Sequence, residues 1–106
     1  MRIAVTSQNF RTVTGHAGKT RRFLIYEADA AGVRELDRLD LPREQSFHEF
    51  SGQGHPVDGT AVLVTGSCGE GFRNKMTQRG IQVLITDLDD PAAAASATYA
   101  ASIAPA

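Results

Sequence analysis

The sequence has little cysteine, no tryptophan and no long apolar run. A single cysteine, Cys68, among 106 residues excludes an internal disulfide and a zinc or iron–sulfur site built from four cysteines of one chain. No apolar stretch approaches the roughly 20 residues that cross a bilayer. The start of the chain also lacks the residue order of a signal peptide. We therefore expect a cytoplasmic protein with no membrane association.

The charge is nearly balanced, since 11 basic residues stand against 12 acidic ones. General nucleic-acid binders need a large basic excess, so we expect no nucleic-acid partner. The charge is nevertheless uneven, because residues 1–22 contain five basic residues and no acidic one. The length fits one domain that spans residues 1–106.

The first half of the chain carries strand patterns. Residues 2–6 alternate in polarity, and residues 23–26 form a continuous apolar run of the kind that lies in a strand buried on both faces. The segment between them is polar and contains glycines, which predicts a loop. Residues 33–41 fit a helix and a strand equally well, and periodicity alone leaves this open.

The second half predicts strand, helix, strand and helix. The apolar run at residues 61–65 is followed by a capping box with Ser67 as the N-cap, and Gly80 is placed to end that helix. We expect a strand over residues 81–85 to pair in parallel with the strand at residues 61–65. Asp90 is the expected N-cap of a last helix that runs to Ile103. A further capping box at Ser46 predicts at most a one- or two-turn helix.

A histidine between glycines, His16, lies close to several cations. The segment 15–20 ends like a phosphate-binding loop, but Val13 stands where the first glycine belongs and a strand rather than a helix follows, so a nucleotide site is not expected. Glycines allow a ligand to approach the backbone, and Lys and Arg suit an anion. Either this segment binds an anion or it is a solvated loop. The cations concerned are Lys19, Arg21 and Arg22.

The segment Ser67, Cys68, Gly69 lies where a parallel strand passes into a helix, a position at which α/β sheets commonly bind ligands. If Ser67 is the N-cap, Cys68 is the first helical residue, where free N–H groups stabilise a thiolate. Cys68 is thus a candidate ligand, although a small packing cysteine fits the same pattern. His48 and His55 are further candidate metal ligands, but their spacing matches no zinc signature.

Several segments together resemble one known family. The opening Met1–Ser7, the segment Val13–Gly18 before Phe23–Glu27, and the later Val62–Gly66 and Arg79–Val83 are similar in content and order to the dinitrogenase iron–molybdenum cofactor biosynthesis family. Its members include NifX, NafY and the C-terminal domain of NifB. These segments span nearly the whole chain.

This resemblance implies an RNase H-like α/β fold. It has a mixed five-stranded sheet, antiparallel in its N-terminal half and parallel in its βαβα C-terminal half, with helices on both faces. Residues 33–41 then form the third antiparallel strand. It also implies a non-catalytic protein that binds, stores or hands on a preassembled iron–sulfur or iron–molybdenum–sulfur cluster. Cluster-donating and cluster-accepting assembly proteins would be its partners, and the protein itself would be a monomer or a weak homodimer.

A preassembled cluster brings its own sulfides and is anionic, so one or two protein ligands with cations and N–H donors can hold it. His16 matches the Gly-His position of the family and is the first candidate ligand. The full candidate set for cluster binding is His16, Lys19, Arg21, Arg22, Ser67, Cys68 and Gly69, with His48 and His55 as further metal ligands. Two alternatives stay open: a protein-interaction module that binds no metal, and a simple zinc or copper site made by the histidines.

Overall fold

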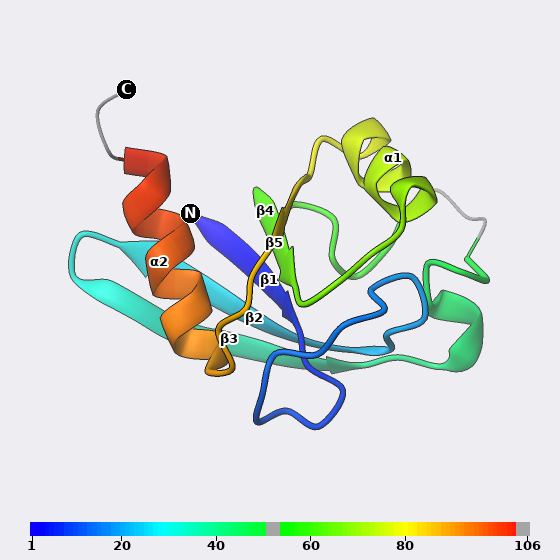
Figure 1. Cartoon of the computed structure of the whole chain (residues 1–106), viewed down its shortest axis with the longest axis horizontal. Helices are drawn as coiled ribbons and strands as arrows, with labels where there is room; N and C mark the ends of the chain where they lie inside the picture. Colours follow the sequence, from blue (N-terminus) through cyan, green and yellow to red (C-terminus); the bar gives the residue numbers. More distant parts are fainter. Residues whose placement is uncertain (51–53, 104–106) are drawn as a thin grey trace.

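One mixed sheet of five strands forms the centre of the molecule, in the order β3-β2-β1-β4-β5 (Figure 1). The computed structural model describes residues 1–50 and 54–103. Strand β2 is antiparallel to both β1 and β3, whereas β4 is parallel to both β1 and β5. The predicted α/β fold with a mixed five-stranded sheet is therefore confirmed. Its elements are β1 (Arg2–Thr6), β2 (Arg22–Asp29), β3 (Gly32–Asp40), a 3₁₀ turn η1 (Arg43–Gln45), β4 (Val62–Thr65), α1 (Glu70–Gln78), β5 (Gln82–Ile85) and α2 (Pro91–Ile103).

Strand β3 contains nearly all of residues 33–41, the segment whose periodicity fits both a helix and a strand. It pairs antiparallel with β2 from Arg22 opposite Asp40 to Asp29 opposite Gly32. The register shifts once, so that Leu36 is an extra residue on β3, and its side chain is exposed. Because β3 is an edge strand with most of its side chains in water, its sequence lacks the apolar run that identifies β2. The bulge blunts this edge against pairing with another chain.

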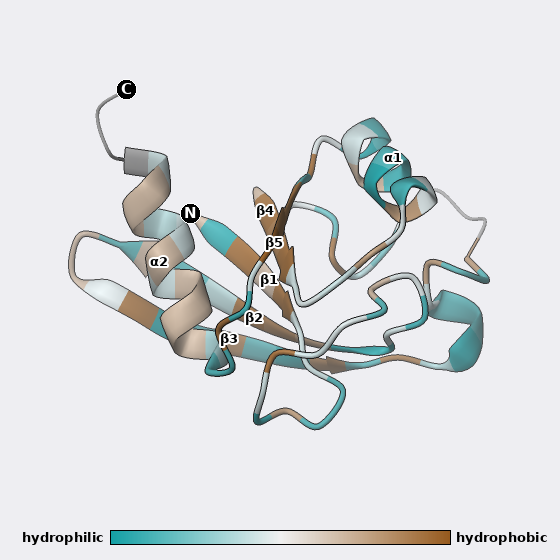
Figure 2. Ribbon diagram, in the orientation of Figure 1, coloured by the Kyte–Doolittle hydropathy of each residue, from teal (hydrophilic) through white to brown (hydrophobic). Residues whose placement is uncertain are grey.

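The two faces of the sheet are covered by different helices. Phe72 and Met76 of α1 pack on one face, against side chains such as Phe23 of β2 and Leu63 of β4. The other face carries α2, whose Ala94 and Ala95 pack on alternate residues of the same strands. Figure 1 shows α1 and α2 lying apart with strands between them, and Figure 2 shows the apolar strands and the hydrophilic outer side of α1. No helix within the described residues is both long and apolar enough to span a bilayer.

The ends of the helices confirm two predictions and correct a third. Gly80, at φ +74°, terminates α1 in the left-handed region, and the Asp90 carboxylate accepts the Ala93 N–H at 2.8 Å as the cap of α2. The prediction that Ser67 caps α1 is wrong, because the N-cap is Gly69 and no side chain caps it. Cys68 consequently lies before the helix and not at its first position.

The predicted capping box at Ser46 is also wrong. Ser46 ends the 3₁₀ turn η1, and Glu49 does not reach back to it but forms an ion pair with Arg43 at 3.6 Å. A single turn follows, in which the N–H groups of Glu49 and Phe50 donate to the Ser46 carbonyl. Phe47 on this turn is buried and packs edge-on against Phe72 of α1. The turn is therefore held by tertiary packing instead of local capping.

Candidate functional site

Two loops that are distant in sequence meet at one edge of the sheet. The loop of residues 7–21 leaves the carboxyl end of β1, and the loop of residues 66–69 leaves the carboxyl end of β4. Since β1 and β4 are adjacent and parallel, both ends open on the same edge. From there the chain continues to β2 on one side and through α1 to β5 on the other. Such a switch point is where open α/β sheets place their ligands.

Direct hydrogen bonds join the two loops. The Gly66 N–H donates to the Thr14 carbonyl at 3.0 Å, and the Ala17 N–H donates to the Ser67 carbonyl at 3.1 Å. The His16 N–H donates to the Ser67 hydroxyl at 2.9 Å. The Ser67 side chain that was expected to cap a helix therefore positions His16 instead.

The close approach of the loops requires two glycines. A Cβ on Gly15 would collide with the hydroxyl of Ser67, and one on Gly66 would lie 3.3 Å from the Thr14 carbonyl oxygen. Both are tighter than ordinary contacts between packed atoms. The glycines flanking this junction thus serve the contact between loops, which is a packing role that their spacing in the sequence does not reveal.

An open cavity of about 380 Å³, which we call the loop pocket, lies where these loops meet. It gathers six of the nine candidate residues: His16, Lys19, His48, Ser67, Cys68 and Gly69. The remaining lining residues are Ala17, Gly18 and Phe72. Residues far apart in the chain are thus brought into one site. The size suits a small ligand, since binding pockets typically have volumes of about 300–1,000 Å³.

His16 presents its side chain at the exposed rim of this pocket. Its backbone has φ +53°, in the left-handed region where residues other than glycine are uncommon. The turn is held by the Lys19 N–H, which donates to the His16 carbonyl at 2.9 Å. The imidazole itself makes no hydrogen bond with the described residues and is open to a ligand.

Cys68 and His48 reach the pocket from other segments. Cys68 is half-buried, packs partly against the core on the α1 side and lines the pocket with the rest of its surface. His48 is exposed, and its backbone N–H donates to the Gly18 carbonyl at 2.6 Å, which fixes the turn of residues 46–50 beside the His16 loop. Within residues 1–50 and 54–103, no three His, Cys, Asp or Glu side chains are grouped closely enough to hold a metal ion.

The three candidate cations separate. Lys19 lines the loop pocket, and Arg21 lines an adjacent hollow. Arg22 is directed elsewhere: its guanidinium pairs with Asp40 at 3.2 Å and lies over the Phe10 ring. Arg22 is the first residue of β2 and Arg21 lies just before it, and successive side chains of extended backbone point to opposite sides.

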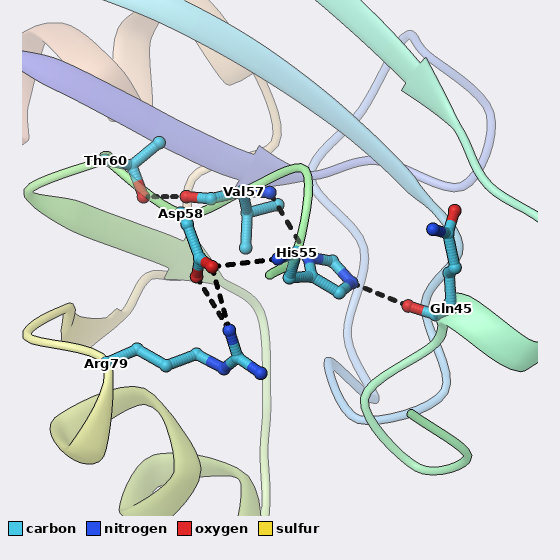
Figure 3. Close-up of polar contacts among 6 residues, drawn as sticks. All are labelled: Gln45, His55, Val57, Asp58, Thr60 and Arg79. Atoms are coloured by element: carbon cyan, nitrogen blue, oxygen red, sulfur yellow. Dashed lines mark hydrogen bonds and ion pairs between the residues drawn. The ribbon is translucent and has the colours of Figure 1, made fainter. Parts of the chain in front are cut away.

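His55 does not line the loop pocket. Figure 3 shows the residues that contact it. It is 6% exposed and stacked on Phe47 with ring centroids 4.0 Å apart. Its Nδ1 accepts the Val57 N–H at 3.2 Å, and its Nε2 donates to the Gln45 carbonyl at 2.7 Å. Burial lowers the pKa of His55 below its usual value. Both ring nitrogens are occupied by backbone groups, which is the geometry of a neutral core histidine.

Asp58 completes this cluster. Its carboxylate accepts the His55 backbone N–H at 2.8 Å and two bonds from the Arg79 guanidinium at 2.8 and 3.0 Å (Figure 3). Partial burial opposes ionisation, but these hydrogen bonds outweigh it and lower the pKa of Asp58. Arg79 in turn lies over the Phe47 and Phe50 rings. The cluster ties residues 45–50 and 55–58 to the C-terminal end of α1.

Two residues near the site were not among the candidates. Phe72 forms an apolar part of the pocket wall and also packs in the core on the α1 side of the sheet. Arg43 lines the hollow beside the pocket together with Arg21. Arg22 pairs with Asp40 across the β2–β3 hairpin, so the residues just after β3 lie close to those just before β2. This pairing is the signal that could have placed Arg43 beside Arg21.

Comparison with known proteins identifies solved structures that share this fold. No curated protein matches it. A crystal structure of PH0822 has a TM-score of 0.60 and 20% identity, covering 80% of this chain and 76% of the other. An NMR structure of a protein from Thermotoga, described as a provisional NifB protein of the DUF35 family, has a TM-score of 0.55 and 17% identity. That match covers 95% of this chain and 86% of the other. At these identities the structures show a shared fold.

The sequence pattern of one family covers nearly the whole chain. This pattern, described as dinitrogenase iron-molybdenum cofactor, matches residues 1–102. The match confirms the resemblance found in the separate motifs, and it connects the chain with nitrogen fixation and with the biosynthesis of the nitrogenase cofactor. The chain belongs to the dinitrogenase iron–molybdenum cofactor family.

Proposed function

We propose that this chain is a non-catalytic carrier that binds a preassembled, anionic metal–sulfur cluster in the loop pocket during nitrogenase cofactor assembly. Its family supports a role in cofactor biosynthesis. The observation that carries the proposal is the meeting of His16, Cys68 and His48 around one open cavity. Imidazole and thiolate are both ligands of iron in clusters.

The number of ligands fits a cluster better than a bare ion. A closed mononuclear zinc site needs four protein ligands, whereas a cluster carries its own sulfides and needs only one or two from the protein. His16 is the proposed primary ligand, and Cys68 and His48 are proposed secondary ligands on the opposite loops. His55 is left out of this set because backbone groups occupy its ring nitrogens.

The electrostatics of the rim also suit an anionic cargo. Lys19 lines the pocket, and its ammonium group makes no ion pair with the described residues. Gly69 lines the same pocket and has no side chain to block approach to the backbone. A cation and backbone N–H donors stabilise the negative charge of bound sulfide. We infer that Arg22, which faces Asp40, takes no direct part.

The exposure of the pocket fits transfer. His16 and His48 are both exposed, so a second protein can reach a cluster held there without this chain unfolding. The proposed partners are assembly proteins that donate and accept the cluster. The proposal includes the RNase H-like assignment of the fold, a cytoplasmic location and a monomer or weak homodimer.

The test is cluster loading of a pocket variant and an exposed control variant. The purified protein is incubated anaerobically with a preassembled iron–sulfur or iron–molybdenum–sulfur cluster and passed through gel filtration, and metal, sulfide and visible absorption are measured in the protein peak. We expect His16→Asn to load less, because Asn tolerates the left-handed backbone but lacks the imidazole. Arg34→Gln changes an exposed side chain that does not line the pocket and is expected to load like the wild type.

Two outcomes would overturn parts of the proposal. Loading that is unchanged in His16→Asn removes the assignment of the main ligand. A colourless, metal-free wild-type peak removes the carrier function altogether and favours a protein-interaction module, for which partner pull-down is the next experiment.

A further inference from the structure

A second hollow of about 270 Å³ adjoins the loop pocket, and we call it the cationic hollow. Lys19 and His48 line both, whereas Arg21 and Arg43 line only the cationic hollow of the two. Its remaining lining residues are Ser46 and Glu49. Three cations therefore surround a space that contains one carboxylate.

The charge in this hollow is not compensated. The side chains of Lys19 and Arg21 make no ion pair or hydrogen bond with residues 1–50 or 54–103. The one acid, Glu49, lies 3.6 Å from the Arg43 Nε, and both side chains are largely exposed. Such an exposed ion pair contributes little, because water screens both charges. Like charges held together repel each other unless an anion lies among them.

A hydroxyl also lines the hollow. Ser46 is 4% exposed as a whole residue, and its side chain makes no hydrogen bond with the described part of the chain. Its Oγ is not itself buried, since no buried side-chain polar atom of the described residues lacks a partner. Because Ser46 lines the hollow, its hydroxyl can donate to a ligand there. The hydroxyl thus adds a neutral donor to the cations.

The backbone holds these groups in place. The Leu41 N–H donates to the Arg21 carbonyl at 2.8 Å, and the His48 N–H donates to the Gly18 carbonyl at 2.6 Å. Two bonds thus join the segment that carries Arg43 and Ser46 to the segment that carries Lys19 and Arg21. The two segments that carry the cations are therefore held side by side without a ligand, so the backbone need not be ordered when one binds.

We propose that the cationic hollow is a binding site for a small oxyanion with two or more negative charges, a polycarboxylate or a phosphate. Guanidinium groups match carboxylate and phosphate oxygens with paired hydrogen bonds. The volume limits the ligand to a small molecule. The site goes beyond cluster binding and does not depend on it, because Arg21, Arg43 and Ser46 do not line the loop pocket.

The experiment is an amide NMR titration of the cluster-free protein at low ionic strength, with inorganic phosphate in one series and citrate in the other. We expect saturable shifts centred on residues 19–21 and 43–49 with at least one probe. Arg21→Gln and Arg43→Gln should each weaken binding about fivefold, as expected for charge-assisted hydrogen bonds near a surface. Ser46→Ala should weaken it about threefold.

Arg34→Gln is the matched control. It removes the same charge from an exposed position near the other end of the β2–β3 hairpin and should leave the affinity unchanged. Saturable binding of either probe with this pattern supports the site. No saturable binding of either probe, or equal weakening in Arg34→Gln, overturns it. Arg43→Gln also separates the two sites, since it should keep cluster loading while it loses the oxyanion.

Discussion

Replacing His55 by Phe tests whether this histidine holds the fold together. A phenyl ring can keep the stack on Phe47 but has neither an acceptor for the Val57 N–H nor a donor for the Gln45 carbonyl. Val57 is fully buried, so its N–H cannot turn to water. Gln45 is half-buried, and its carbonyl can be partly hydrated.

The cost follows from these two groups. A buried donor left without a partner costs about 1–3 kcal/mol, and a lost hydrogen bond at a hydrated site costs about 0.5–1.5 kcal/mol. We therefore expect His55→Phe to lower the free energy of unfolding by about 1.5–4.5 kcal/mol. This is a large part of the roughly 5–15 kcal/mol that stabilises a typical domain.

The pH dependence of stability gives a second signature. Burial is the main cause that lowers the pKa of His55 in the folded chain, and the charge of Arg79 lowers it further, while the Gln45 carbonyl and Asp58 oppose the shift. The unfolded chain then binds a proton more tightly than the folded one. The contribution is fully present above the usual histidine pKa of about 6.5. It is lost as the pH falls through the folded pKa. His55→Phe should lack this loss.

Urea unfolding followed by circular dichroism at about pH 7.5 and about pH 5.5 measures both effects. His48→Ala is the control, because His48 is exposed and its removal should change stability by less than about 0.5 kcal/mol. The reasoning is refuted if His55→Phe unfolds within 0.5 kcal/mol of the wild type. It is equally refuted if the variant keeps the full loss of stability at the lower pH.

Three further substitutions test the junction, a cap and the thiol, with urea unfolding as the common assay. Gly15→Ala should cost about 1–3 kcal/mol through its clash with the Ser67 hydroxyl, and adding Ser67→Ala should recover most of the loss; no recovery would contradict the contact. Asp90→Ala should cost about 1 kcal/mol by removing the cap of α2, and a change below 0.3 kcal/mol would contradict this. Cys68→Ser should alter the visible spectrum of the loaded protein if the thiol is a ligand, whereas reduced stability alone would assign it to packing.

The sheet could be predicted because its signals are local. Alternation at β1, the apolar run of β2 and the strand–helix–strand pattern around α1 each lie within a few residues. Edge strand β3 could not be assigned from periodicity, because neither of its faces is continuously buried. Only the resemblance to a family settled it.

The site could be predicted in part, and its errors have one cause. His16, His48 and Cys68 were chosen by residue type, and they do meet. The role of Ser67 was misread because its partner, the His16 N–H, lies 51 residues away. Arg22 was grouped with Lys19 and Arg21 because all three are basic and close in sequence. The residue at which β2 begins decides which way each successive side chain points, and the composition of the loop does not identify that residue.

The hydrogen bonds between the two loops also set an order of events during synthesis. The ribosome makes the chain from the N-terminus, so His16 emerges long before Ser67 and Cys68. Until β4 pairs with β1, the Thr14 carbonyl lacks the Gly66 N–H and the His16 N–H lacks the Ser67 hydroxyl. An unfinished chain therefore has no loop pocket, and only molecules that have completed the parallel half of the sheet are competent to receive cargo.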